Sequence, residues 1–73
     1  MRVHVEGAGF MRKRISPVDL DLPGGSTVSV LSGALDIHDS PGVVFFRGGR
    51  RVSPNAALND GDEIMVVSML SGG

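Results

Sequence analysis

Hydrophobic and polar residues alternate near the start of the chain with a period of two, which is typical of a half-buried β-strand. Val3 and Val5 fall on one face of residues 1–6, and polar side chains fall on the other. The alternation resumes over residues 15–22 after a break at Gly7–Arg14, so we predict an antiparallel hairpin with a basic tip. Pro17 cannot donate a ladder hydrogen bond, so the second strand should lie at a sheet edge or carry a bulge.

The middle of the chain predicts one short helix. Residues 23–25, Pro-Gly-Gly, form a turn, and Ser26 or Thr27 can cap the helix that follows. Val28, Leu31 and Leu35 are spaced at i, i+3 and i+7, which places them on one helical face directed at the sheet.

The remaining residues predict three more strands. Val43–Arg47 is a short apolar run typical of a buried strand, Arg50–Val52 follows a Gly-Gly turn, and Glu63–Leu70 is the last strand. One helical turn is expected at Ala56–Leu58. The apolar last strand fits parallel pairing with the first strand at the sheet centre. We therefore predict one α+β domain over residues 1–73: a β-grasp fold with a mixed four- to five-stranded sheet and one helix packed across one face.

Composition excludes several classes of protein. The 73 residues include no cysteine, so disulfides and cysteine-ligated metals are excluded, and the separated His4 and His38 do not predict a metal site. No apolar run approaches the ~20 residues of a membrane span, and no signal segment is recognisable, so we expect a cytoplasmic protein without a membrane partner. Asp60, Asp62 and Glu63 lack the other ligand positions of a calcium loop, and we interpret them as a hydrogen-bonded turn.

Most of the positive charge lies in two loops. Six of the seven basic residues are found there: Arg12, Lys13, Arg14, Arg47, Arg50 and Arg51. They would form one basic patch if the loops lay together, but no aromatic residues interleave with them for base stacking. We interpret both loops as solvated turns and do not expect nucleic acid binding, since the net charge is -1.

The C-terminal motifs resemble those of a known family. Leu58-Asn59-Asp60-Gly61-Asp62-Glu63-Ile64 is similar to the entry into the last strand of the ubiquitin-like sulfur carriers, the ThiS and MoaD group, which also includes the archaeal small modifier proteins. Ser71-Gly72-Gly73 resembles the flexible diglycine tail of that family. The resemblance covers the whole chain in length and element order.

This resemblance implies a carrier function without an intrinsic catalytic site. An E1-like enzyme would adenylate the Gly73 carboxylate with ATP, and a sulfur donor would convert it to a thiocarboxylate. A biosynthetic enzyme of the thiamine or molybdopterin pathway would then accept the sulfur. The chain itself would bind no cofactor; Gly73 would be the covalent attachment point, with Ser71 and Gly72 as the tail that enters the partner.

Alternation in the strands suggests where that enzyme docks. If Ile64 faces the helix, then Met65, Val67 and Met69 face away from it, and the run at residues 43–47 is expected to place Phe45 with them and Val44 and Phe46 inside. Exposed apolar patches are typical of interaction sites. The expected docking residues are Phe45, Met65, Val67, Met69 and Leu70, although these side chains would also suit a homodimer or mutual coverage.

Two alternatives stay open. In the first, the same fold is a protein modifier joined through Gly73 to lysines of target proteins. Lys13 is the only lysine of the chain, which argues against elaborate polymers of it. In the second, the chain is a non-covalent interaction or RNA-binding β-grasp module, for which salt-sensitive nucleic acid binding would be the diagnostic property.

Overall fold

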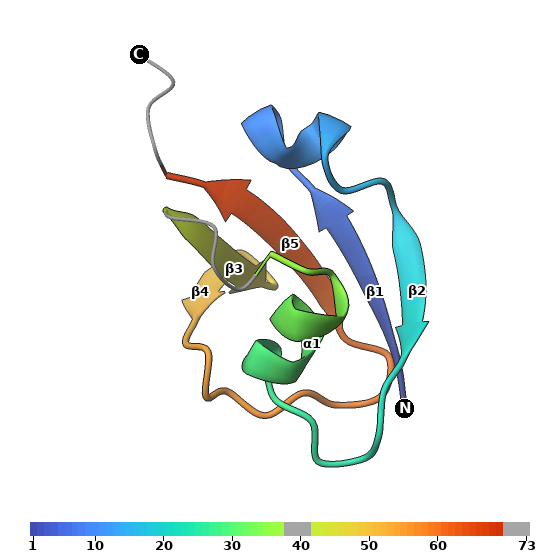
Figure 1. Cartoon of the computed structure of the whole chain (residues 1–73). Helices are drawn as coiled ribbons and strands as arrows, with labels where there is room; N and C mark the ends of the chain where they lie inside the picture. The colour runs from blue at the N-terminus through green and yellow to red at the C-terminus, as the bar shows by residue number, and fades with distance from the viewer. Residues whose placement is uncertain (38–41, 70–73) are drawn as a thin grey trace.

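The computed structural model describes residues 1–37 and 42–69, which form one mixed sheet covered on one face by a helix. Figure 1 shows the arrangement. The strands are β1 (Arg2–Gly7), β2 (Val18–Asp21), β3 (Val43–Arg47), β4 (Arg50–Val52) and β5 (Glu63–Ser68), and the helices are the 3-10 helix η1 (Gly9–Lys13) and α1 (Val28–Ala34). The strand order in the five-stranded sheet is β2-β1-β5-β3-β4.

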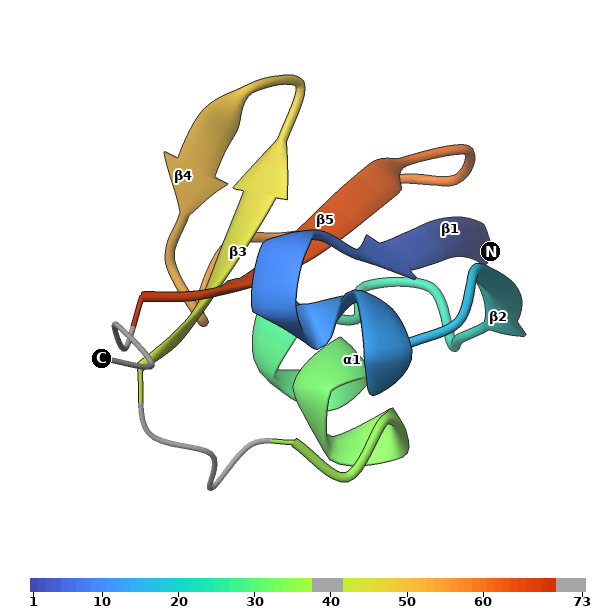
Figure 2. The same ribbon diagram turned by 90° about the horizontal axis from the view of Figure 1, so that it is seen from above.

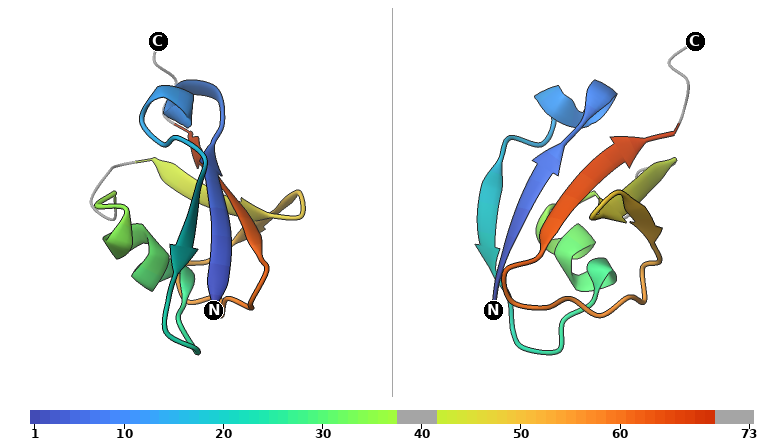
Figure 3. Two further views of the ribbon diagram at one scale, coloured as in Figure 1. Left: turned by 90° about the vertical axis from the view of Figure 1, so that its right-hand side faces the viewer. Right: turned by 180° about the vertical axis from the view of Figure 1, so that it is seen from behind.

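The last strand occupies the centre of the sheet. β5 pairs in parallel with β1 and antiparallel with β3, as the view from behind in Figure 3 shows. The predicted parallel pairing of the first and last strands is therefore confirmed. β2 is an edge strand, as expected from Pro17, but it begins only at Val18, immediately after the proline.

The helix covers the inner face of the sheet, and the main core lies between them (Figures 2 and 3). Val28 and Leu31 of α1 are fully buried, as the helical spacing predicted, and Leu35 is half-buried at the helix end. They pack in one cluster with the inward side chains of three strands: Val3, Val5, Phe45, Ile64 and Val66. Burying such side chains contributes roughly 1.5–3 kcal/mol each and is the main stabilising term of a domain this small.

The helix N-terminus is satisfied by backbone rather than by a side chain. Thr27 is the N-cap, but its side chain makes no capping hydrogen bond. Instead the N–H groups of Val28 and Ser29 donate to the carbonyls of Ala56 and Pro54, at 3.0 and 2.8 Å. The helical turn predicted at Ala56–Leu58 is wrong, since that segment is extended and Ala57 bridges to Thr27. The carbonyl of Ala56 and that of Pro54, just before the segment, cap α1, so the chain here does not form a helix of its own.

The connection between β1 and β2 is more ordered than a simple turn. It contains η1, whose Met11 is only 2% exposed and joins the core. Gly7 allows this, because a Cβ at that position would collide with the carbonyl of Met11 and would lie 3.0 Å from the Cβ of Ile15. The segment therefore closes one end of the core while its basic side chains remain exposed.

The two basic loops do not form one patch. η1 follows β1, beside the C-terminal half of β5, where the N–H of Ala8 donates to the carbonyl of Val66 at 2.9 Å. The β3–β4 turn follows Arg47, which pairs with Ile64 at the start of β5. The loops thus lie on opposite sides of β5 and toward its opposite ends, so each is a separate exposed turn.

Candidate functional site

The turn before β5 is held by hydrogen bonds from two neighbouring strands. The carboxylate of Asp62 accepts from Arg47 Nη1 at 2.9 Å and from the N–H of Asn59 at 2.8 Å. Asp60 Oδ1 accepts from the N–H of Arg2 at 2.7 Å, and Gly61 has a positive φ of 87° that favours glycine. The aspartates of this motif therefore fix the start of β5 between β1 and β3, as the predicted hydrogen-bonded turn requires.

The pairing of β3 with β5 corrects the expected orientation of two phenylalanines. Phe45 lies opposite Val66 and is 7% exposed, so it faces the helix and belongs to the core. Phe46 lies opposite Met65, and Val44 opposite Val67, so both lie on the outer face. Phe45 was expected to face away from the helix as a docking residue, and this expectation is wrong. Residues 43–46 are all apolar, so no polar residue among them indicates which side chains face the core.

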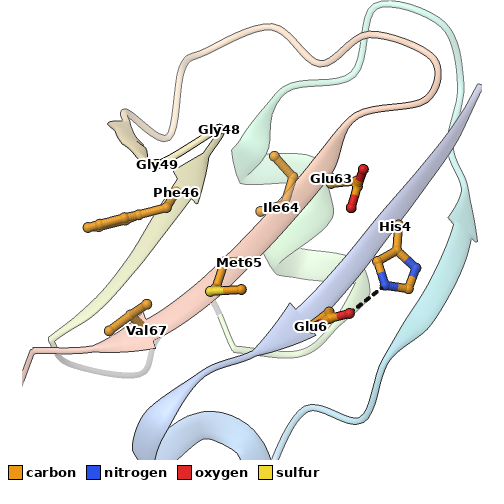
Figure 4. Close-up of a pocket in the computed structure, with 9 residues that line it drawn as sticks. All are labelled: His4, Glu6, Phe46, Gly48, Gly49, Glu63, Ile64, Met65 and Val67. Carbon is orange, nitrogen blue, oxygen red and sulfur yellow. Dashed lines mark hydrogen bonds and ion pairs between the residues drawn. The ribbon is translucent and has the colours of Figure 1, made fainter.

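Phe46, Met65 and Val67 form the apolar part of the outer face. They line an open hollow of about 450 Å³ together with His4, Glu6 and Glu63, with Gly48 and Gly49 at one end. Figure 4 shows these side chains on β3, β5 and β1. Met65 is 40% exposed, which is high for a large apolar side chain on a central strand. Such a face can bind another surface without any covalent chemistry of its own.

The polar side of the hollow centres on a histidine between two carboxylates. His4 Nδ1 lies 2.7 Å from Asp19 Oδ1, and His4 Nε2 lies 3.0 Å from Glu6 Oε1. The hydrogen bond to Glu6 first, and the one to Asp19 second, raise the pKa of His4 above its ordinary value. At mildly acidic pH the cluster therefore carries an imidazolium between two carboxylates.

The second charged cluster on this side of the sheet lies near the edge. Arg2 forms an ion pair with Asp21, with Nε 3.2 Å from Oδ1, and this interaction lowers the pKa of Asp21. On the outer face the charged side chains thus lie on β2, on β1 and at Glu63 where β5 begins, and the apolar ones lie on the rest of β5 and on β3. In the part of the chain that the structure describes, no group of three His, Cys, Asp or Glu residues is arranged to hold a metal ion.

The predicted tail lies largely outside the described residues. Leu70, Ser71, Gly72 and Gly73 are not among them, and their roles stay predictions. Met69 is described; it is 62% exposed, and its N–H donates to the carbonyl of Gly42 at 2.7 Å. Among residues 1–37 and 42–69, no helix is long and apolar enough to span a membrane.

Two aromatic residues outside the core, the half-buried Phe46 and the exposed Phe10, do not follow from the sequence analysis. Phe46 was assigned to the core, and only the strand register places it on the outer face. Phe10 lies on η1 beside the basic run and is 70% exposed. The sequence feature that could have indicated its exposure is its position directly after Gly9, in a segment without the alternation of a strand.

Comparison with known proteins identifies similar sequences and folds. The family model of the ThiS family matches residues 11–73. No curated protein matches significantly in sequence.

Several solved structures share the fold. The archaeal modifier SAMP1 from Haloferax volcanii has a TM-score of 0.76 and 20% identity, with all of both chains covered. A molybdopterin converting factor subunit 1 from Pyrococcus furiosus has a TM-score of 0.78 and 23% identity, covering 93% of this chain and 97% of that one. A ubiquitin from Caldiarchaeum subterraneum has a TM-score of 0.70 and 18% identity, covering 100% and 98%. The predicted ubiquitin-like β-grasp fold is therefore confirmed.

Proposed function

Because the chain belongs to the ThiS family, a family of small carrier folds rather than catalytic enzymes, we propose that it is a sulfur carrier activated at the carboxylate of Gly73. The observation that carries the proposal is the family match, which extends over residues 11–73 and so includes the terminal Gly72-Gly73. The sulfur would serve thiamine or molybdopterin biosynthesis.

The chemistry belongs to the partner enzyme. A carboxylate is a poor acyl donor, so an E1-like enzyme joins the Gly73 carboxylate to the adenylyl group of ATP and releases pyrophosphate. Hydrosulfide released by a sulfur donor then attacks the acyl carbon, forms the C–S bond and expels AMP, which leaves the thiocarboxylate that passes its sulfur to the biosynthetic enzyme. Positioning ATP and stabilising charge are tasks of the partner's site, and this chain supplies the carboxylate and the docking surface. We place the cycle in the cytoplasm, where ATP is available.

The outer face supports the docking part of this proposal. Phe46, Met65 and Val67 offer an apolar surface of adjacent side chains, and Met69 extends exposed apolar surface beyond β5. Methionine adapts its shape readily, which suits a carrier that must bind first an activating enzyme and then a sulfur acceptor. Both partners would use the same face in turn.

One alternative has a specific observation in its favour. The structural neighbours include a protein named as a modifier and one named as a ubiquitin. In that alternative, the acyl-adenylate at Gly73 is joined to a lysine amine of a target protein instead of receiving sulfur. The two functions share the activation step and differ in the nucleophile that follows it.

The test is the intact mass of the chain after incubation with the E1-like enzyme of the same organism, ATP and a sulfur donor. The carrier function predicts a product heavier by the difference between a sulfur and an oxygen atom. The modifier function predicts a covalent adduct with a protein lysine. If the enzyme is shown to be active on another carrier protein but leaves the mass of this chain unchanged, both functions are refuted.

Gly73→Ala provides the matched control. We expect it to abolish the mass change, because a methyl group beside the reacting carboxylate obstructs entry into a narrow channel. Its urea unfolding curve should match that of the unaltered chain. Normal thiocarboxylate formation by Gly73→Ala would contradict the assignment of a tight channel around this residue.

A further inference from the structure

The hollow on the outer face owes its shape to the two glycines of the β3–β4 turn. Gly48 and Gly49 have φ of 59° and 79°, and an added Cβ at either would meet no atom within 4 Å. Gly48 and Gly49 have no side chains, so the turn leaves the space on this side of the hollow open. The hollow therefore has one apolar wall, formed by Phe46 and Met65, and one acidic side, formed by Glu63 and Glu6.

We propose that this hollow binds an arginine side chain of the partner protein, with its stem against Phe46 and Met65 and its guanidinium at the carboxylate of Glu63. This arginine site adds a contact to the proposed docking surface, and it rests on the proposed function only in that the partner is taken to be the E1-like enzyme. Figure 4 shows the apolar residues and Glu63 arranged along one side of the sheet.

The apolar wall fits the stem of a long side chain. Arginine and lysine bury their methylene groups on apolar surface while the charged end reaches polar groups. Met65 is 40% exposed and lies directly opposite Phe46, so the two side chains form a continuous wall. A purely apolar residue would cover this wall but would leave Glu63 facing it without a counter-charge.

The charges around the hollow favour a cation. Glu63 is exposed, and it forms no hydrogen bond or ion pair with another side chain within residues 1–37 and 42–69. Two cations of the same face are engaged by other carboxylates: Arg2 pairs with Asp21, and His4 lies between Glu6 and Asp19. Arg51 lies opposite Phe46 on the far side of β3 from β5 and is not among the residues that line the hollow. Glu63 thus remains as the carboxylate available to a partner.

Arginine fits the hollow better than lysine. A guanidinium is planar, can stack on the ring of Phe46 and can bind a carboxylate through two parallel hydrogen bonds. An ammonium group is more strongly hydrated and offers only a point charge. The apolar wall beside a carboxylate therefore selects the planar cation.

The first experiment measures adenylation by the E1-like enzyme of the same organism, as pyrophosphate exchange at varied carrier concentration. We expect Glu63→Gln to raise KM about tenfold, with kcat within about twofold, since a docking contact acts equally on ground state and transition state. Asp36→Asn is the matched control. It removes the same charge from an exposed residue at the end of α1, beyond the other face of the sheet, and asparagine tolerates its positive φ of 58°. Its KM should not change.

The second experiment tests the hollow without the enzyme. The ¹⁵N-labelled chain is titrated with N-acetyl-arginine amide and, separately, with the neutral isostere N-acetyl-citrulline amide. Arginine should shift the amide signals of Gly48, Gly49, Glu63 and Met65 more than those of α1, and Glu63→Gln should reduce the shifts. Capped lysine should produce smaller ones.

The outcomes separate this inference from the proposed function. An unchanged KM for Glu63→Gln, with the unaltered chain adenylated, overturns the arginine contact and leaves the carrier function intact. Absent shifts, or equal shifts with citrulline, also overturn it. An unaltered chain that is not adenylated counts against the carrier function, while local arginine shifts would still support the hollow as a site for a partner's arginine.

Discussion

The carboxylate of Asp62 holds the start of the central strand, and its removal should destabilise the whole sheet. Asp62→Ala deletes the acceptor of two hydrogen bonds, from Arg47 at 2.9 Å and from the N–H of Asn59 at 2.8 Å. The side chains of Arg47 and Asp62 are 32% and 17% exposed, so the pair is only partly screened by water. The substitution therefore tests whether the motif is a structural part of the fold.

The magnitude follows from these contacts. A partly exposed ion pair contributes at most about 1 kcal/mol, and a backbone N–H left without its charged acceptor costs about 1–2 kcal/mol. We expect Asp62→Ala to lower the free energy of unfolding by about 2–3 kcal/mol. Domains of this size have total stabilities of roughly 4–11 kcal/mol, so the loss is a large fraction.

Urea unfolding followed by circular dichroism measures the effect. With a slope of about 1 kcal/mol/M, the midpoint should fall by about 2–3 M. Asp60→Ala loses one hydrogen bond from the N–H of Arg2 and no ion pair, so it should cost only about 1 kcal/mol. In a double-mutant cycle, Arg47→Gln and Asp62→Ala should show a coupling of about 1 kcal/mol. A loss below about 0.5 kcal/mol for Asp62→Ala, or strictly additive costs, would refute this account of the turn.

Two further predictions concern stability. Gly7→Ala should lower the unfolding free energy by about 2 kcal/mol or more in urea, because its methyl group collides with the Met11 carbonyl. Gly24→Ala, where a Cβ meets open space, should be nearly neutral, and equal costs would contradict the explanation. The raised pKa of His4 means that its stabilisation is present below its unfolded pKa of about 6.5 and is lost as pH rises through the folded value. The stability difference between the unaltered chain and His4→Gln should therefore be larger at about pH 5.5 than at about pH 8.5 by urea unfolding, and a pH-independent difference would show that the hydrogen bonds do not favour the imidazolium.

The first strand, with its clear alternation, could be predicted and oriented from the sequence, whereas the apolar run at residues 43–47 could be predicted as a strand but not oriented. Val3 and Val5 alternate with polar residues, which fixed both the first strand and its buried face. In the run that contains Phe45 and Phe46, the side chains on the two faces of the strand are equally apolar. Only pairing with β5 decides which phenylalanine is buried, and pairing is a property of the whole sheet.

Tertiary contacts also overrode two local expectations. The segment at Ala56–Leu58 has the composition of a helical turn, but the carbonyl of Ala56, like that of Pro54 just before the segment, accepts a hydrogen bond from the start of α1. Met11 looked like part of a solvated turn, yet it is buried because Gly7 lets the backbone fold back closely. For the candidate site, the sequence indicated Met65 and Val67 correctly as outward-facing, but the presence of His4 and Glu6 in their hollow depends on β1 lying next to β5.

The central position of β5 sets the order of events during synthesis. Before residues 63–68 leave the ribosome, no strand joins the β1–β2 hairpin to the β3–β4 hairpin, because β5 is the strand between them. Val5 and Phe45 then lack the partners Ile64 and Val66 with which they pack. Isolated two-stranded hairpins are marginal in water, so a ribosome stalled before residue 63 carries a chain without a stable core, open to proteases. Formation of the core thus has to wait for residues 63–68.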